Sequence, residues 1–77
     1  MDDRRQILVE TLSGKTLVIP AKASATIAMI KGKIQEKERI PPAEQNLVLS
    51  SKVLEDDSKT LHDYDIKQGT TLRLFRL

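Results

Sequence analysis

The side chains that could act as a nucleophile, a base or a metal ligand are few and scattered. His62 is the only histidine and there is no cysteine, which excludes a cluster of imidazole ligands and a cysteine-based metal site. A serine–histidine–aspartate arrangement would depend on His62 alone as its base, and the neighbouring Asp63 would point elsewhere on a helical turn. We therefore interpret His62 as a surface histidine.

Two other patterns are candidates for ligand binding. The acidic run 55–57 could hold a cation, but it lacks the spacing and the closing glutamate of a calcium loop. Gly14, Gly32 and Gly69 are too scattered to form a phosphate-binding loop. We expect a solvated acidic turn, tied down by the hydroxyl of Tyr64. No catalytic residue, metal or cofactor is predicted, so the chain is not expected to be an enzyme.

Length and composition limit the remaining functions. The 77 residues, 39% hydrophobic and 31% charged, suit one small domain. The net charge is only +2 and the aromatic residues are Tyr64 and Phe75 alone, so neither charge nor stacking groups indicate nucleic-acid binding. The absence of cysteine favours a reducing compartment, the cytoplasm or the nucleus, and no apolar run approaches the roughly 18 residues of a membrane span. We expect a monomer with neither nucleic-acid nor membrane partners.

The first element is a β-hairpin over residues 6–21. Two aliphatic runs flank a turn in which Gly14 can adopt the positive φ that tight turns need. Alternation puts Ile7 and Val9 on a covered face and their neighbours on a wet face. Pro20 lacks an N–H, which predicts that the second strand lies at an edge of the sheet or ends there.

A helix is predicted over residues 24–39. Isoleucines recur at helical spacing there, and Ser24 or Thr26 can cap the first turn. The pair Pro41–Pro42 prevents the helix from continuing. Gly32 in its middle costs roughly 1 kcal/mol relative to alanine, which indicates either a close approach to the sheet or simple tolerance.

Three more strands complete the predicted domain, over residues 46–49, 53–54 and 71–75. A short helical turn is expected at Leu61–Tyr64, with Thr60 as its cap. The order is strand, strand, helix and three strands. With one helix to cover a sheet, this order predicts an α+β domain whose other sheet face is open to water.

The open face carries unexpected apolar residues. If Leu47 and Leu74 point inward, alternation places Val48, Arg73 and Phe75 outward. Leu12 adds an apolar residue in a turn, where polar residues are usual. Each residue alone would be unremarkable, because single exposed apolar side chains are common. Together, rimmed by Arg73 and Lys52, they would form a partner-binding patch.

The chain resembles ubiquitin from Gln6 to Phe75. The shared residues lie in four ordered stretches, with one extra residue in the loop 55–59: Gln6-Ile7-x-Val9-x-Thr11-Leu12-x-Gly14-Lys15-Thr16, Lys31-x-Lys33-Ile34-Gln35-x-Lys37-Glu38-x-Ile40-Pro41-Pro42, Leu54-Glu55-Asp56 and Thr60-Leu61-x-Asp63-Tyr64-x-Ile66. The resemblance implies the β-grasp fold, a mixed five-stranded sheet wrapped around the helix, with the first and last strands parallel and adjacent.

The resemblance also implies where partners bind. In ubiquitin and its relatives, receptor helices grasp an apolar patch of the sheet, and the matching positions here are Leu12, Val48 and Phe75, with Arg73 at the family's histidine position. The expected partners are proteins with ubiquitin-binding helices and proteasomal ubiquitin receptors. Five lysines match positions used for ubiquitin chain linkage, although solvated surface charges are the simpler interpretation: Lys15, Lys31, Lys33, Lys37 and Lys52.

The departures from ubiquitin are informative. The chain stops at Leu77 without the Gly-Gly of conjugated members, and Asn46 replaces an arginine important to the activating enzyme. Residues 1–5 form an N-terminal extension ahead of the domain at 6–77, and Arg39 replaces the glycine that follows ubiquitin's helix. We therefore expect a non-catalytic interaction domain, part of a longer protein. The alternatives are a covalent modifier, or a ubiquitin variant, whose Gly-Gly tail is missing from this sequence, and a scaffold for nucleic acid or a small GTPase.

Overall fold

The computed structural model describes residues 4–76. In chain order the elements are β1 (Arg5–Glu10), β2 (Thr16–Ala21), α1 (Ile27–Glu38), the one-turn 3₁₀ helix η1 (Pro42–Glu44), β3 (Gln45–Leu49), β4 (Lys52–Val53) and β5 (Thr71–Arg76). The predicted order of strands and helix is confirmed.

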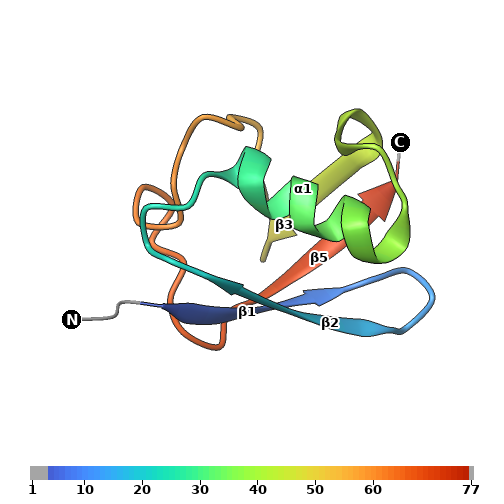
Figure 1. Cartoon of the computed structure of the whole chain (residues 1–77), viewed down its shortest axis with the longest axis horizontal. Helices are drawn as coiled ribbons and strands as arrows, with labels where there is room; N and C mark the ends of the chain where they lie inside the picture. Colours follow the sequence, from blue (N-terminus) through green and yellow to red (C-terminus); the bar gives the residue numbers. More distant parts are fainter. Residues whose placement is uncertain (1–3, 77) are drawn as a thin grey trace.

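All five strands form one sheet in the order β2-β1-β5-β3-β4. β1 and β5 are parallel and adjacent, and the other neighbouring pairs are antiparallel. Helix α1 crosses one face of this sheet (Figure 1), and no other α-helix of residues 4–76 covers the opposite face. The mixed sheet around a single helix confirms the β-grasp fold.

An aliphatic core lies between α1 and the sheet. Ile7, Val9 and Ile19 from the hairpin and Ile30 and Ile34 from α1 have no exposed surface. The alternation of buried and exposed residues along β1 and β2 is the predicted one. Neither aromatic side chain belongs to the fully buried set, so the core depends on Ile, Leu and Val packing.

Both ends of α1 are satisfied by specific groups. Thr26, rather than Ser24, is the N-cap, and its hydroxyl accepts a hydrogen bond from the Met29 N–H, so the helix begins later than predicted. The helix ends at Glu38, where Arg39 takes the left-handed conformation with φ of 59°. A Cβ at Gly32 would meet no atom within 4 Å, so this glycine is tolerated rather than required by close packing.

Two further predicted elements differ from the structure: the strand predicted at 53–54 is β4 at Lys52–Val53, one residue earlier, and the segment after Thr60 is less regular than a helix. Residues 61–65 form consecutive turns and no continuous helix; the Tyr64 N–H donates to the Thr60 carbonyl, as in one helical turn, and Thr60 caps the segment as predicted. The Thr60 hydroxyl accepts from the Asp63 N–H, and the Asp63 carboxylate accepts from the Thr60 N–H. The 3₁₀ helix lies elsewhere, at η1, and Pro42 opens it.

The two edges of the sheet are unlike. At the β2 edge, Pro20 pairs with Gln6, whose N–H and C=O bond to Gln68 and Gly69 on its other side. Pro20 therefore directs its own backbone groups away from β1, and its carbonyl accepts a hydrogen bond from the Lys33 ammonium. At the other edge, β4 has only two residues. The prediction that Pro20 marks an edge strand is confirmed.

A buried glutamine joins the helix to the strand that carries the candidate site. The side-chain amide of Gln45 donates to the carbonyls of Lys31 and Ile40, at 2.9 Å each. Gln45 is the first residue of β3 and is 1% exposed. These bonds set the position of β3, and with it Val48, relative to the end of α1.

Candidate protein-binding site

The outward residues of β3 and β5 lie side by side on the open face. Val48 pairs with Arg73, and Asn46 pairs with Phe75. Val48 is partly buried, Arg73 is exposed and Phe75 retains 37% of its surface. The structure thus places these three predicted site residues on one face, as strand alternation requires.

Leu12 joins this group from the turn between β1 and β2. It is 71% exposed, the largest value among the exposed large hydrophobic residues of the described chain. Together with Arg73 and Phe75 it lines a shallow hollow of about 250 Å³. We call Leu12, Val48, Arg73 and Phe75 the sheet patch.

Arg73 lies in the middle of a row that crosses the sheet. It pairs with Glu10 of β1 on one side and with Val48 on the other. Within residues 4–76, no hydrogen bond or ion pair engages its guanidinium group. Arg73 can therefore offer its full fork of N–H donors to a carboxylate of a partner while its stem borders Val48.

Sequence reasoning missed Val53. This residue pairs with Val48 across β3 and β4 and is 44% exposed, so it enlarges the apolar surface beside the sheet patch. Its place in a strand was predicted, but the register that sets it opposite Val48 depends on a turn the sequence did not define. Leu8 and Val18 form another apolar pair on the same face, across β1 and β2.

Lys52 is placed differently from the sheet patch. It pairs with Leu49, which packs against the core, so it lies on the opposite side of β4 from Val53. Its ammonium is 5.0 Å from the centre of the Tyr64 ring, at a distance suited to a cation–π contact. The lysine lies near the patch in the sheet, but its charge is directed to the tyrosine.

The other lysines matched to linkage positions differ in accessibility. The Lys31 side chain is 9% exposed and its ammonium lies 2.9 Å from the Asp57 carboxylate, which disfavours it as a modification site. Lys15 forms a 2.9 Å ion pair with Glu38, and Lys33 donates to Pro20. Lys37 is exposed in the last turn of α1.

The acidic turn is organised by hydrogen bonds. The hydroxyl of Tyr64 accepts from the Asp56 N–H at 3.1 Å, as predicted. Hydrogen bonds from Ser58 hold the pKa of the Asp56 carboxyl below its usual value. Among residues 4–76, no group of three His, Asp or Glu residues is arranged to hold a metal ion. Nor does any helix in this part combine the length and apolar character needed to cross a membrane.

The mixed sheet, the single crossing helix and the open apolar face define a β-grasp domain. Comparison with known families matches residues 7–76 to the ubiquitin family, and the chain belongs to that family.

Several relatives are compact ubiquitin-like proteins. The chain is 41% identical over 69 residues to the NEDD8-like protein RUB3 of Arabidopsis thaliana, covering 90% of this chain and 87% of that protein. It is 40% identical over 68 residues to the ubiquitin-like protein NEDD8 of Dictyostelium discoideum, covering 88% and 87%. A third relative is far longer: the chain is 38% identical over 72 residues to AN1-type zinc finger protein 4 of Mus musculus, covering 94% of this chain but 10% of that protein.

Proposed function

We propose that this chain is the folded body of a covalent ubiquitin-like modifier of the NEDD8 type. The observation that carries the proposal is the match to NEDD8-like proteins along 87% of their length, at about 40% identity. Conjugated members of the ubiquitin family act through a C-terminal Gly-Gly that is activated and transferred to a lysine. The proposal therefore requires a natural chain that continues past Leu77 to Gly-Gly.

A second candidate is a non-covalent interaction domain within a longer protein. The relative that favours it is the zinc finger protein, of which the matched region is only a tenth. Asn46, at the position of an arginine important to ubiquitin's activating enzyme, agrees with this candidate. The domain would then present its surface to ubiquitin receptors without being transferred.

Both candidates use the sheet patch to bind proteins. Leu12, Val48 and Phe75 supply apolar contact area, and Arg73 supplies an unengaged cation at its border. An amphipathic receptor helix offers the complementary chemistry, with an apolar stripe flanked by acidic residues. Ubiquitin-binding helices and proteasomal ubiquitin receptors are the proposed partners.

The natural coding sequence and an activation assay separate the two candidates. The full natural chain is incubated with ATP and purified ubiquitin-activating or NEDD8-activating enzyme. A thioester-linked adduct that thiols cleave, formed by a chain ending in Gly-Gly, supports the modifier. A reading frame that continues into another domain, with no adduct formed, overturns the modifier and leaves the interaction domain.

Patch binding is tested by titrating isotope-labelled protein with a helical ubiquitin-binding peptide. We expect the largest amide shifts at Leu12, Val48 and Phe75. Val48→Ala should weaken binding about tenfold, because it removes apolar contact area at the centre of the patch. The matched control is Val18→Ala, the same change on the same sheet face in β2. Equal losses in both variants, or no shifts at saturating peptide, would exclude the patch.

A further inference from the structure

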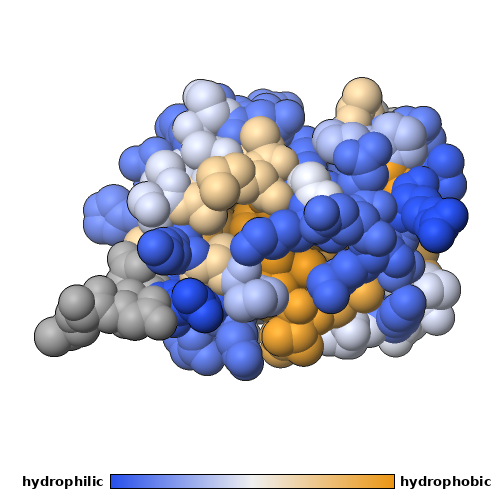
Figure 2. All heavy atoms as spheres, viewed as in Figure 1, coloured by the Kyte–Doolittle hydropathy of each residue, from blue (hydrophilic) through white to orange (hydrophobic). Residues whose placement is uncertain are grey.

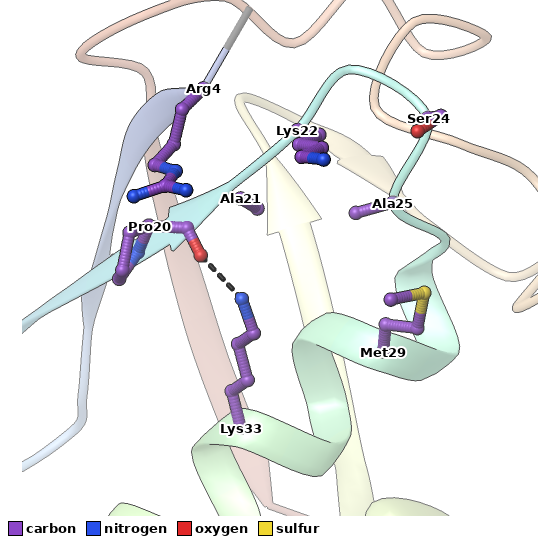
Figure 3. A pocket seen from close by; sticks show the side chains of 8 residues that line it. All are labelled: Arg4, Pro20, Ala21, Lys22, Ser24, Ala25, Met29 and Lys33. Carbon is purple, nitrogen blue, oxygen red and sulfur yellow. Dashed lines mark hydrogen bonds between the residues drawn. The ribbon is translucent and has the colours of Figure 1, made fainter. Parts of the chain in front are cut away.

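A groove lies between the end of β2 and the start of α1, away from the sheet patch. It encloses about 460 Å³, within the range of sites that hold small ligands or peptide side chains. Figure 3 shows its lining: the strand end at Pro20 and Ala21, Lys22 after it, and Ala25, Met29 and Lys33 from the helix side. No sheet-patch residue belongs to this lining.

The groove has an apolar floor. Ala21 and Ala25 are 4% and 6% exposed, so their methyl groups are part of the packed structure. Met29 is 55% exposed and its side chain points from α1 back toward Ala25 (Figure 3). Figure 2 shows apolar surface between α1 and β2 on this side of the molecule, with hydrophilic side chains around it. An apolar side chain of a partner would find flexible thioether and methyl contacts here.

The rim of the groove is cationic. Arg4, Lys22 and Lys33 are among its lining residues, and no acidic residue of the described range 4–76 belongs to the lining. Within residues 4–76, the Lys22 ammonium forms no hydrogen bond or ion pair. Lys33 is fixed by its hydrogen bond to the Pro20 carbonyl, drawn in Figure 3, and keeps further N–H donors. Lys22 and Lys33 therefore present several N–H donors to an anion, and within residues 4–76 no carboxylate in the lining competes for them.

We propose that this groove binds an acidic peptide segment of a partner protein. One apolar side chain lies against Met29, Ala21 and Ala25. Carboxylates on either side of it accept charge-assisted hydrogen bonds from Lys22 and Lys33. The alternation of acidic and apolar groups in the ligand mirrors the cationic rim and apolar floor, which is the complementarity that gives specificity and a fast association rate.

The same features disfavour nucleic acid and membrane surfaces. Neither Tyr64 nor Phe75 belongs to the lining, so bases have no aromatic side chain to stack on. The net charge of the whole chain is only +2, so the chain has little excess positive charge with which to bind a long polyanion. A short peptide fits such a local site, whereas a long polyanion needs an extended basic surface.

The test is a titration of isotope-labelled protein with the acetylated and amidated peptide Ser-Asp-Leu-Glu-Asp-Ser. Saturable amide shifts at Lys22, Ala25 and Met29 are expected. The neutral analogue, with Asn and Gln in place of the acids, should bind at least tenfold more weakly. Shifts that are equal for both peptides, or confined to the sheet patch, overturn the proposal.

Charge reversal provides the matched comparison. Lys22→Glu should weaken the acidic peptide at least tenfold, while Lys37→Glu, which makes the same change in net charge outside the lining, should stay within about threefold of the parent. Comparable losses of peptide affinity in the two variants would show that net charge causes the effect, and would overturn the proposal that the groove binds the peptide. Measured thermal unfolding of both variants checks that they are folded.

Other possible ligands of the groove would give different results in the same titration. An RNA oligonucleotide or an anionic lipid vesicle that shifts the same amides more strongly than the peptide overturns the peptide assignment. The chain itself has Asp2 and Asp3 next to Arg4. If the peptide binds only when both are changed, as Asp2→Asn and Asp3→Asn, the groove belongs to the chain's own N-terminal residues and the proposal fails.

Discussion

Arg39 occupies a backbone conformation that glycine adopts most easily. Its φ is 59° and ψ is 33°, directly after α1, and its N–H donates to the Gln35 carbonyl at 2.7 Å. Side chains with a Cβ are disfavoured in this left-handed region. Ubiquitin has glycine at the matching position, which is the residue that this conformation favours.

Arg39→Gly should therefore stabilise the protein. The variant relieves the clash of the Cβ, and this gain exceeds the added freedom of the unfolded chain, for a net of about 0.5–1 kcal/mol. Urea unfolding measures the change in free energy. Lys37→Gly, in the last turn of the helix, is the control and should destabilise by about 1 kcal/mol. A destabilised Arg39→Gly would show that the arginine side chain contributes more than its backbone costs.

Asp63 links stability to pH. Hydrogen bonds from the Thr60 backbone and side chain hold the pKa of its carboxyl below the ordinary 3.8. Because the pKa is lower in the folded state, this contribution is present above about 3.8 and is lost as pH falls through the folded value. Asp63→Asn keeps a hydrogen-bond acceptor but cannot titrate.

The expected result is a flatter acid limb for Asp63→Asn in a series of unfolding free energies from about pH 6 to about pH 2. Asp56→Asn should act in the same direction, since Ser58 lowers the pKa of Asp56 by the same kind of hydrogen bond. The double variant should be flatter than either single variant. A limb unchanged from the parent in all three would exclude these two carboxyls as the source of acid sensitivity.

Among the elements, α1 contains a glycine that lowers the stability of the helix and that can be replaced. Gly32 lies in its middle, and a Cβ there would meet no atom within 4 Å. Gly32→Ala should raise the unfolding free energy by about 1 kcal/mol, because alanine loses less conformational freedom in a helix. Thermal unfolding followed by circular dichroism measures it. Gly14→Ala is the control: with φ of +85° at Gly14, the same change should destabilise. A loss of stability in Gly32→Ala would mean that the helix is tighter there than its contacts indicate.

Periodicity predicted the elements whose signal lies within one segment. The hairpin alternation and the isoleucine spacing of α1 depend on nearby residues, and both agree with the structure. The difference at Leu61–Tyr64 has a local cause too: the Tyr64 N–H donates to the Thr60 carbonyl and the Asp65 N–H to the His62 carbonyl, so single turns close there without continuing into a helix. Pro42 was interpreted as a helix terminator, yet proline is also favoured at the first position of a helix, and η1 begins there.

The candidate site, like the elements, could be predicted only where the signal lies within one segment of the chain. Alternation was sufficient to place Val48, Arg73 and Phe75 outward, because the residues between them had to be buried. It could not supply Val53, since pairing across β3 and β4 depends on the turn that includes Ser50, a residue with φ of 57°. The groove at Lys22 had no sequence signal, because its floor forms only when the strand end and the helix start pack together.

At the scale of the molecule, the order of the strands in the sheet could not be predicted from the hydrophobic periodicity of the sequence. β1 and β5 come from opposite ends of the chain and pair in parallel through Leu8 and Thr71, Val9 and Leu72, and Glu10 and Arg73. Nothing in the pattern of either strand specifies a partner so distant in sequence. The family resemblance supplied this pairing, which brings Arg73 between Glu10 and Val48.

The sheet patch and the groove should act independently. They share no lining residue and lie on different parts of the fold. Combining Val48→Ala with Lys22→Glu should therefore reproduce the sum of the single effects within about 0.5 kcal/mol for each peptide. Titration of the double variant with the helical peptide and with the acidic peptide measures both. A larger deviation would reveal coupling through the sheet.

The two edges of the sheet affect how readily copies of the protein pair with one another at high concentration. A free strand edge can template pairing with another copy and so begin a fibril. Here one edge carries Pro20, which lacks an N–H, and its carbonyl is already taken by Lys33. The other edge is a strand of two residues, too short to propagate a ladder. The protein can thus keep an apolar face available to partners while resisting aggregation with copies of itself.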